Sequence, residues 1–263
     1  MNEPSLAALH ILVTRPAPQQ TELVTAIQDA SGTALHLPLL EIGPLTELTN
    51  NALLIEQIQN LDNYHILIFV SANAVHFGMQ WIERYWPQFP HCVELVAIGP
   101  RTAADLAVAL HEPVSHAEIG AASEKLLELP VFHSIAGRRI GIFRGQGGRE
   151  LLAQTLVERG ASVDYLEVYT RKLVPYDSVD FVASLRAESI NVLTVSSGES
   201  LQHLSATLGD NKAEMSLLPL LVPSPRVAEQ AKAAGFRQVI DAGGADAASM
   251  MTALRQLAGQ SSA

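Results

Sequence analysis

The sequence predicts an α/β protein with two similar lobes, each a doubly wound parallel sheet. Short apolar runs without polar alternation are separated by helix-period segments of about ten residues, which is typical of parallel strands buried on both faces. The same three-part pattern runs through the 263-residue chain twice, at an offset of about 125 residues. Two homologous halves imply two lobes, and we expect a small ligand to bind in a cleft between them.

In the first half, a strand–helix–strand unit is followed by two strand–helix units. Leu23, Ala26 and Ile27 share one face of the first predicted helix, and Gly32 is expected to end it. The apolar runs predicted to be strands are 9–14, 35–40, 66–70 and 95–98, and an alanine-rich helix is predicted over 102–110.

The second half repeats this order. A strand–helix–strand unit is predicted within 138–168, with Gly160 as the helix stop. Strands are then predicted over 192–195 and 218–222, with an alanine-rich helix over 227–234. Two extended, proline-flanked segments, 38–44 and 167–175, occupy equivalent places in the two halves and are candidate connectors between the lobes.

The composition indicates a folded, acidic protein. Hydrophobic residues make up 48% of the chain, and the formal charge of −10 argues against general nucleic-acid binding, which needs a basic face. The N-terminus lacks the pattern of a signal peptide and no apolar run is long enough to span a membrane, so a cytoplasmic location is expected. The single cysteine, Cys92, is expected to be a small buried side chain, which leaves no disulfide framework.

Three pairs of equivalent strand-to-helix turns are the candidate binding sites. In doubly wound sheets, ligands bind beyond the carboxyl ends of the strands, where the amides of helix starts favour an anion. Arginine adds forked donors that suit a carboxylate or a phosphate. The candidate residues are Thr14, Arg15, Arg144 and Gly145 in the first pair, Ser71, Ala72, Asn73, Ser196, Ser197 and Gly198 in the second, and Gly99, Arg101, Ser224 and Arg226 in the third.

Each turn also has a structural explanation. The glycine-rich turn can be a tight turn with solvated arginines, and the serines can simply cap the helices that follow. A nicotinamide site is disfavoured because Glu150 stands where the dinucleotide fingerprint needs its third glycine. A serine hydrolase is disfavoured because Phe69 and Asn73 replace the glycines around Ser71. The nine histidines show no metal-binding spacing, so no metal site is predicted.

An ordered set of segments resembles the uroporphyrinogen-III synthase family and covers nearly the whole chain. The segments are Val-Thr-Arg-Pro at 13–16, Leu-Pro-Leu-Leu-Glu-Ile at 37–42, Val-Ser-Ala-Asn-Ala-Val at 70–75, Ala-Ile-Gly-Pro-Arg-Thr at 97–102, Arg-Gly-Gln-Gly-Gly-Arg-Glu at 144–150 and Leu-Glu-Val-Tyr at 166–169. The resemblance implies a first lobe of residues 1–38 plus 173–263 and a second of 45–165. It also implies two linker strands, 39–44 and 166–172, and an active site between the lobes.

The implied reaction closes the linear tetrapyrrole hydroxymethylbilane into uroporphyrinogen III, a step of heme biosynthesis. Water is lost and ring D is inverted through a spiro intermediate, with no metal or organic cofactor. The polycarboxylate substrate suits the predicted donor turns. Tyr169 matches the family's linker tyrosine, and its phenol can hydrogen-bond the departing hydroxyl, although a tyrosine that only packs is the alternative. The turn at 223–227 departs from the pattern, because it lacks the threonine that Thr102 supplies in the first repeat.

The expected partners are hydroxymethylbilane itself and the upstream hydroxymethylbilane synthase, with neither nucleic acid nor membrane. The chain is expected to act as a monomer, because two lobes need no second copy to form a cleft. The alternative function is a non-catalytic two-lobe binding protein for an anionic metabolite, which would use the same turns.

Overall fold

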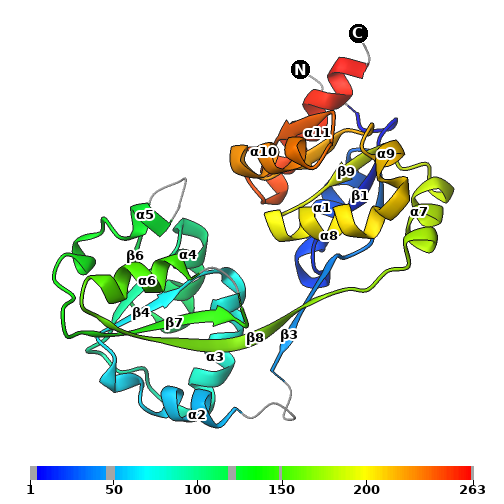
Figure 1. The fold of residues 1–263 in the computed structure, drawn as a ribbon. Coiled ribbons are helices and arrows are strands. Elements are labelled where there is room, and N and C mark those ends of the chain that lie inside the picture. The colour runs from blue at the N-terminus through cyan, green and yellow to red at the C-terminus, as the bar shows by residue number, and fades with distance from the viewer. Residues whose placement is uncertain (1–4, 46–50, 118–122, 148–149, 262–263) are drawn as a thin grey trace. The chain divides into compact units, whose positions relative to one another are not determined.

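The protein consists of two compact units, each built on its own sheet. The computed structural model describes residues 5–45, 51–117, 123–147 and 150–261 (Figure 1). Unit 1 comprises Met1–Ile42 and Lys172–Ala263, and unit 2 comprises Gly43–Arg171. Eight strand pairings, four in each unit, are parallel, which confirms the predicted α/β class with two parallel-sheet lobes.

Unit 1 contains a five-stranded sheet with the order β11-β10-β9-β1-β2. Its strands are β1 (His10–Val13), β2 (Thr33–His36), β9 (Val192–Thr194), β10 (Leu220–Val222) and β11 (Val239–Asp241). Its helices are α1 (Ala17–Asp29), α7 (Ser178–Ala187), α8 (Gly198–Leu208), α9 (Lys212–Met215), α10 (Pro225–Ala233) and α11 (Ala247–Ser261), with a 3-10 turn at Gly209–Asn211.

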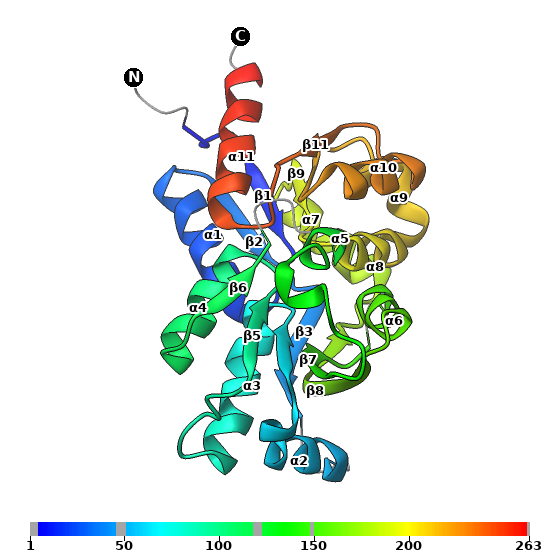
Figure 2. The same ribbon diagram turned by 90° about the vertical axis from the view of Figure 1, so that its left-hand side faces the viewer.

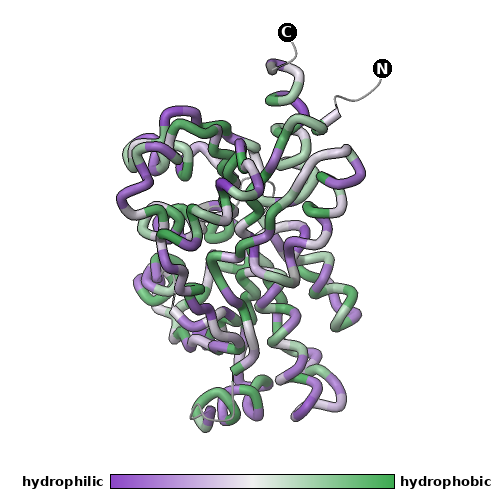
Figure 3. Tube along the Cα trace, turned by 90° about the vertical axis from the view of Figure 1, so that its right-hand side faces the viewer, coloured by the Kyte–Doolittle hydropathy of each residue, from purple (hydrophilic) through white to green (hydrophobic). Residues whose placement is uncertain are grey.

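Both faces of this sheet are covered by helices because its strand residues are apolar on both sides. Leu12 and Leu193 pack against α7, α8 and α10 on one face. Ile11 and Val192 pack against α1 and α11 on the other face. Figure 2 shows the strands of unit 1 between these two groups of helices. Figure 3 shows hydrophobic and hydrophilic residues alternating within single helices, as expected for helices with one buried face.

Unit 2 contains a six-stranded sheet with the order β3-β8-β7-β4-β5-β6. Its strands are β3 (Leu40–Pro44), β4 (Ile66–Phe69), β5 (Glu94–Ala97), β6 (Val114–His116), β7 (Arg139–Gly145) and β8 (Ser162–Leu173). The first three residues of β3 and the last two of β8 belong to unit 1. Its helices are α2 (Ala52–Gln59), α3 (Ala72–Tyr85), α4 (Pro100–Leu110), α5 (Ser123–Leu126) and α6 (Leu151–Glu158), with 3-10 turns at Leu61–Asn63 and Pro130–Phe132.

The faces of the unit 2 sheet differ in their side chains. Ile66 and Ile68 belong to an aliphatic core shared with α5 and α6. On the other face Phe69 and Phe143 stack at 4.3 Å between ring centroids. Helix α3 packs directly on these rings, because a Cβ at Gly78 would lie 2.9 Å from Phe143 Cδ1. The missing side chain at Gly78 thus fixes how close α3 comes to the sheet.

Each unit combines strands from both sequence repeats. Strands β1, β4 and β5 of the first half correspond to β7, β9 and β10 of the second. With this correspondence, β2-β1-β9-β10-β11 in unit 1 and β8-β7-β4-β5-β6 in unit 2 are the same order. Each repeat therefore places its first two strands in one unit and its last three in the other.

Three local expectations were wrong. The predicted strand at 35–40 is split between β2 and β3, because Pro38 has no N–H to donate to the ladder. Helix α1 ends at Asp29 and its left-handed residue is Ser31, with φ 66°. Gly32 instead allows close packing, because a Cβ there would lie 2.9 Å from Ile27 Cγ2. Cys92 is exposed, not buried.

Candidate active site

Within each unit, the candidate residues gather at one edge of the sheet. Most of them lie just after strands, whereas Arg144 and Gly145 end β7 and Tyr169 lies in β8 opposite Gly145. The carboxyl ends of parallel strands share an edge. Unit 1 brings together Thr14, Arg15, Ser196, Ser197, Gly198, Ser224 and Arg226, and unit 2 brings together Ser71, Ala72, Asn73, Gly99, Arg101, Arg144, Gly145 and Tyr169.

The two serine turns form helix caps. Ser71 Oγ accepts a hydrogen bond from Ala74 N at 3.1 Å at the start of α3, which Ala72 and Asn73 open. Ser197 Oγ accepts from Ser200 N at the same distance at the start of α8. Both serines have extended backbones, as N-cap residues do. The capping explanation is therefore confirmed for both.

The third pair of turns opens α4 and α10. Gly99 and Ser224 occupy the N-cap positions and make no side-chain capping bond. Arg101 and Arg226 are exposed on the first turns of these helices. Thr102 is buried next to Arg101, and its counterpart in the repeat is the buried Val227. The threonine that the second repeat lacks thus belongs to a position that faces the core.

Arg226 and the start of α8 lie close together in unit 1. A Cβ at Gly198 would lie 3.7 Å from Arg226 Nη1 and 2.7 Å from Gln230 Oε1. The half-buried Ser196 precedes this turn. Two helix starts and an exposed guanidinium therefore meet at the carboxyl ends of β9 and β10, an arrangement that suits an anion.

The turn after β1 is tied into unit 1 by its own polar groups. Thr14 Oγ1 donates to the carbonyl oxygen of Thr194 at 2.8 Å. Arg15 is 7% exposed, and its carbonyl oxygen is 2.8 Å from His36 Nε2. Burial acts to raise the pKa of Asp246, but hydrogen bonds from Ser249 and the charge of Arg15 outweigh it and hold the pKa below its usual range.

Asp246 was missed in the sequence analysis. It precedes α11, and its Oδ1 accepts from Ser249 N at 2.9 Å. The local signal was an aspartate directly before a helix-period segment, with a polar residue three positions later. It places a carboxylate beside Arg15 at the carboxyl edge of unit 1.

Arg144 closes the turn in which it lies. It is 7% exposed, and its guanidinium carbon is 4.4 Å from the centroid of the Tyr165 ring. Its side chain donates to the carbonyl oxygens of Gly145 and Gly147. Gly147 N donates to Glu167 Oε1 at 3.2 Å. These groups shape the loop that follows β7.

Tyr169 lies beside this loop because β8 carries a bulge. Arg144 pairs with Glu167 and Gly145 pairs with Tyr169, which leaves Val168 as an extra residue. Val168 and Tyr169 are therefore both buried, against the usual alternation of a strand. No sequence signal in the segment 166–169 predicts this bulge.

The Tyr169 ring is enclosed on several sides. A Cβ at Gly145 would lie 2.4 Å from Tyr169 Cε2, so only glycine leaves room for the ring. Phe77 of α3 stacks on it with ring centroids 5.4 Å apart. The hydroxyl oxygen lies 3.3 Å from Ser71 Oγ, and Gln146 N donates to the Tyr169 carbonyl oxygen at 2.9 Å. The phenol is held in place by residues from two strand-to-helix regions of unit 2, β4–α3 and β7–α6.

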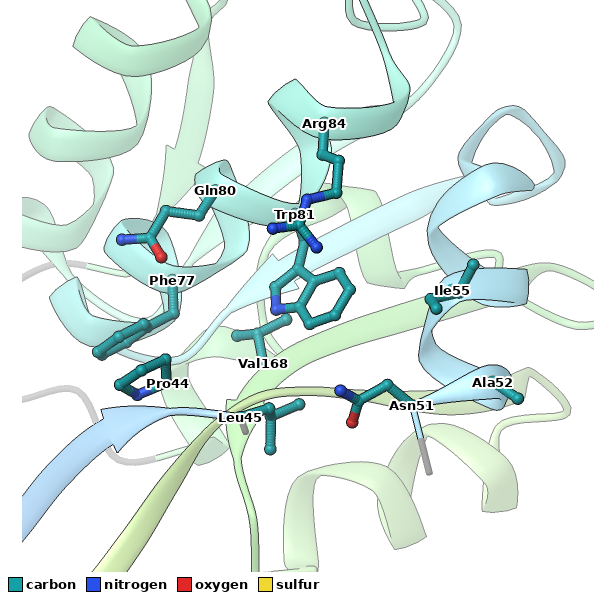
Figure 4. A pocket seen from close by; sticks show the side chains of 10 residues that line it. All are labelled: Pro44, Leu45, Asn51, Ala52, Ile55, Phe77, Gln80, Trp81, Arg84 and Val168. Carbon is teal, nitrogen blue, oxygen red and sulfur yellow. The ribbon is translucent and has the colours of Figure 1, made fainter. Parts of the chain in front are cut away.

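A cavity of about 580 Å³ lies beside this aromatic group (Figure 4). Phe77 and Val168 line it, and Figure 4 shows Trp81 and Arg84 extending from α3 toward it. The Arg84 guanidinium is 5.4 Å from the Trp81 ring. Phe77 thus contacts both the cavity and the Tyr169 ring.

Within the described part of the chain, no group of three or more His, Cys, Asp or Glu side chains could hold a metal ion. Across the same residues, no helix has the length and apolarity needed to span a bilayer.

Comparison with known proteins identifies the family. A family model described as uroporphyrinogen-III synthase HemD matches residues 21–252. The chain belongs to the uroporphyrinogen-III synthase family. The enzyme of that name from Escherichia coli (strain K12) is 35% identical over 252 residues, which are 94% of this chain and 100% of the relative. The Salmonella typhimurium (strain LT2) enzyme is 33% identical over 249 residues, with the same coverage of both chains.

Solved structures of the same family share the fold. A mutant uroporphyrinogen III synthase from Thermus thermophilus matches with a TM-score of 0.66 at 14% identity, covering 96% of this chain and 99% of the other. The Helicobacter pylori 26695 enzyme matches with a TM-score of 0.55 at 15% identity, covering 95% and 99%. The predicted family and the predicted enzyme class, a hydro-lyase of tetrapyrrole biosynthesis, are confirmed.

Proposed function

We propose that this chain closes hydroxymethylbilane into uroporphyrinogen III with loss of water and inversion of ring D. The observation that carries the proposal is the 35% identity to the Escherichia coli enzyme, which spans 94% of this chain and the whole of that relative. An identity of this size along the full length supports a shared reaction as well as a shared fold.

The chemistry of the turns suits the proposed substrate. The starts of α8 and α10 in unit 1, and separately those of α3 and α4 in unit 2, would suit carboxylates, because backbone amides and the positive ends of helices favour negative charge. Arg101 and Arg226 are the exposed guanidinium groups at these starts. Because the substrate is reactive enough to cyclise unaided to the wrong isomer, the protein's main task is to hold the conformation that gives the right one.

Tyr169 is the proposed catalytic residue. Its phenol would donate a hydrogen bond to the hydroxyl group that departs from the substrate and so stabilise the charge that develops on that oxygen. The contacts of its ring with Gly145 and Phe77 support this role, because a phenol that is already fixed needs no reorganisation during the reaction. No step of the proposal calls for a metal or an organic cofactor.

The upstream hydroxymethylbilane synthase is the proposed functional partner. It would deliver a substrate that otherwise closes unaided to the type I isomer. The proposal needs one copy of the chain, since the candidate residues all come from a single polypeptide.

The test is a coupled assay with freshly generated hydroxymethylbilane and chromatographic separation of the type I and type III isomers. We expect the type III isomer to predominate and its yield to rise with protein concentration. Production of the type I isomer alone, at the rate seen without protein, would refute the proposal. If the protein then bound the linear tetrapyrrole without converting it, a non-catalytic binding protein would be the correct description.

A further inference from the structure

The hydroxyl group of Tyr169 has a hydroxyl neighbour at the start of α3. Ser71 Oγ lies 3.3 Å from Tyr169 Oη. This is long for an O–H···O hydrogen bond, and catalytic hydrogen bonds commonly tighten when the substrate binds. The Tyr169 side chain is 5% exposed and Ser71 is half-buried, so the pair is largely shielded from water.

The hydrogen bond that Ser71 accepts from Ala74 N leaves the proton of its own hydroxyl available. A serine hydroxyl has one proton and two acceptor lone pairs. One lone pair accepts the Ala74 N–H at 3.1 Å, so the proton is free to be donated to Tyr169 Oη. If Ser71 is the donor, the phenol keeps its own proton for the substrate.

We propose that Ser71 is a positioning residue that holds the Tyr169 hydroxyl and directs its proton toward the substrate. This proposal rests on the proposed function of Tyr169. The chain of donors runs from the Ala74 amide through Ser71 and Tyr169 to the departing hydroxyl, and donors aligned in one direction strengthen one another. The positive end of α3 also favours negative charge on the oxygens of this chain.

The corresponding serine of the other repeat shows why this role is specific to Ser71. Ser197 caps α8 in the same way, but its Oγ is 2.7 Å from Ser200 Oγ. In the first repeat the equivalent of Ser200 is Ala74, which has no hydroxyl to capture Ser71. One small difference in sequence thus leaves the Ser71 hydroxyl available to Tyr169.

Because the Tyr169 ring is enclosed, the direction of its O–H bond is the main feature of the side chain that a neighbour can change. Gly145 and Phe77 fix the ring plane, so the phenol can change mainly in the direction of its O–H bond. A group that bonds the phenol oxygen therefore controls where its proton points. Ser71 is that group in unit 2, as its contacts with the phenol show.

Three substitutions at Ser71 separate capping from positioning. If the cap alone matters, Ser71→Gly should behave almost like the wild type and Ser71→Ala should be worse, because glycine is the better cap. If the hydroxyl positions Tyr169, both variants should lose about 10-fold in kcat with KM changed less than about twofold, and Ser71→Thr should restore most of the rate.

A double-mutant cycle tests whether Ser71 acts through Tyr169. In a Tyr169→Phe background, Ser71→Gly should cause no further loss of kcat, because the group it positions is gone. An independent, additive loss would overturn the proposal. So would full turnover by Tyr169→Phe alone, although the proposed reaction would stand in both cases.

A readout that does not depend on turnover separates this proposal from the proposed function. With tyrosine labelled with carbon-13 at Cζ, the Tyr169 resonance is assigned as the one missing from Tyr169→Phe. We expect Ser71→Gly to shift this resonance and the matched variant Ser197→Gly to leave it in place. An unmoved resonance in Ser71→Gly would overturn the positioning role, whereas loss of type III product from the wild type would refute only the reaction.

Discussion

Two tyrosines at opposite edges of the unit 2 sheet differ in what holds their hydroxyl groups. Tyr64 precedes β4 at the amino edge, where its hydroxyl donates to Asp164 Oδ2 at 2.8 Å and accepts from Arg139 Nη2 at 3.3 Å. Tyr169 lies at the carboxyl edge with its hydroxyl 3.3 Å from Ser71 Oγ. Both side chains are almost fully buried. Burial therefore does not distinguish a structural phenol from the proposed catalytic one, whereas the chemical nature of the hydrogen-bond partner does.

Tyr64, Asp164 and Arg139 form a hydrogen-bonded group, the Tyr64 cluster, that fixes the phenol. Arg139 Nε donates to Asp164 Oδ2 at 2.8 Å, and the guanidinium lies 4.4 Å from the centroid of the Tyr64 ring. Burial and the hydrogen bond to the Asp164 carboxylate raise the pKa of Tyr64 well above its usual range. The Tyr64 hydroxyl already donates its single proton to the Asp164 carboxylate, so that proton is not available to a ligand.

Tyrosine-to-phenylalanine substitutions at the two positions should differ most in their effects on turnover and stability. Tyr169→Phe removes the proposed donor to the departing hydroxyl, so we expect kcat to fall by about 100-fold with the fold retained. Tyr64→Phe should leave kcat unchanged and lower the free energy of unfolding by about 1–3 kcal/mol, because Asp164 and Arg139 lose a buried partner. Isomer-resolved kinetics and urea unfolding measure both, and equal turnover losses would contradict the distinction.

Two glycines of β7 test the enclosure of Tyr169. A Cβ at Gly145 would meet the Tyr169 ring at 2.4 Å, whereas one at Gly141 would meet Leu67 and Leu166 at 2.7 and 2.8 Å. Both Gly145→Ala and Gly141→Ala should overpack the unit and destabilise it by about 1–3 kcal/mol. Only Gly145→Ala should also lower kcat, by about 10-fold per folded molecule, because it displaces the phenol. Equal kcat values for the two folded variants would show that the ring position does not matter.

Much of the fold was predictable because the strands are short apolar runs that both faces of the sheet bury. The predicted strands at 66–70 and 192–195 are β4 and β9 almost to the residue. The prediction at 35–40 failed because hydrophobicity alone does not register the missing N–H of Pro38. No local pattern predicted the pairing of β1 with β9, because periodicity does not say which repeat supplies a neighbouring strand. Only the family resemblance, through the implied lobe of residues 1–38 plus 173–263, placed the two strands in one lobe.

The candidate site was predictable only as a set of turns. Strand ends and helix starts identified Ser71 and Gly145, and the family resemblance identified Tyr169, but the contact between them depends on the bulge at Val168. Asp246 was not predicted, because the sequence does not distinguish an aspartate that only caps a helix from one that also lies beside an arginine. Side-chain direction, unlike periodicity, arises from packing between elements distant in the chain.

The ion pair between Arg139 and Asp164 should contribute more to stability than the more exposed pair between Arg138 and Glu94. Asp164→Asn removes the charge that Arg139 and Tyr64 share, and we expect the free energy of unfolding to fall by about 1–2 kcal/mol without a change in kcat. Glu94→Gln is the matched control, because Glu94 pairs with Arg138 at 3.1 Å in a more exposed position. Its loss should be below about 0.5 kcal/mol. Similar losses in denaturant unfolding would show that the cluster is an ordinary surface pair.

The raised pKa of Tyr64 should make the stability of the protein depend on pH in the alkaline range. An unfolded tyrosine loses its proton near its ordinary pKa of 10.0, while folded Tyr64 keeps its proton well above that pH. Its contribution to stability is therefore complete below about pH 10 and declines above it, by at most about 1.4 kcal/mol per pH unit. Unfolding free energies measured across this range should fall more steeply for the wild type than for Tyr64→Phe. Tyr176, whose pKa burial also raises, is present in both proteins and cancels in the difference. Parallel curves would mean that the Tyr64 hydroxyl titrates as freely in the folded protein as in the unfolded chain.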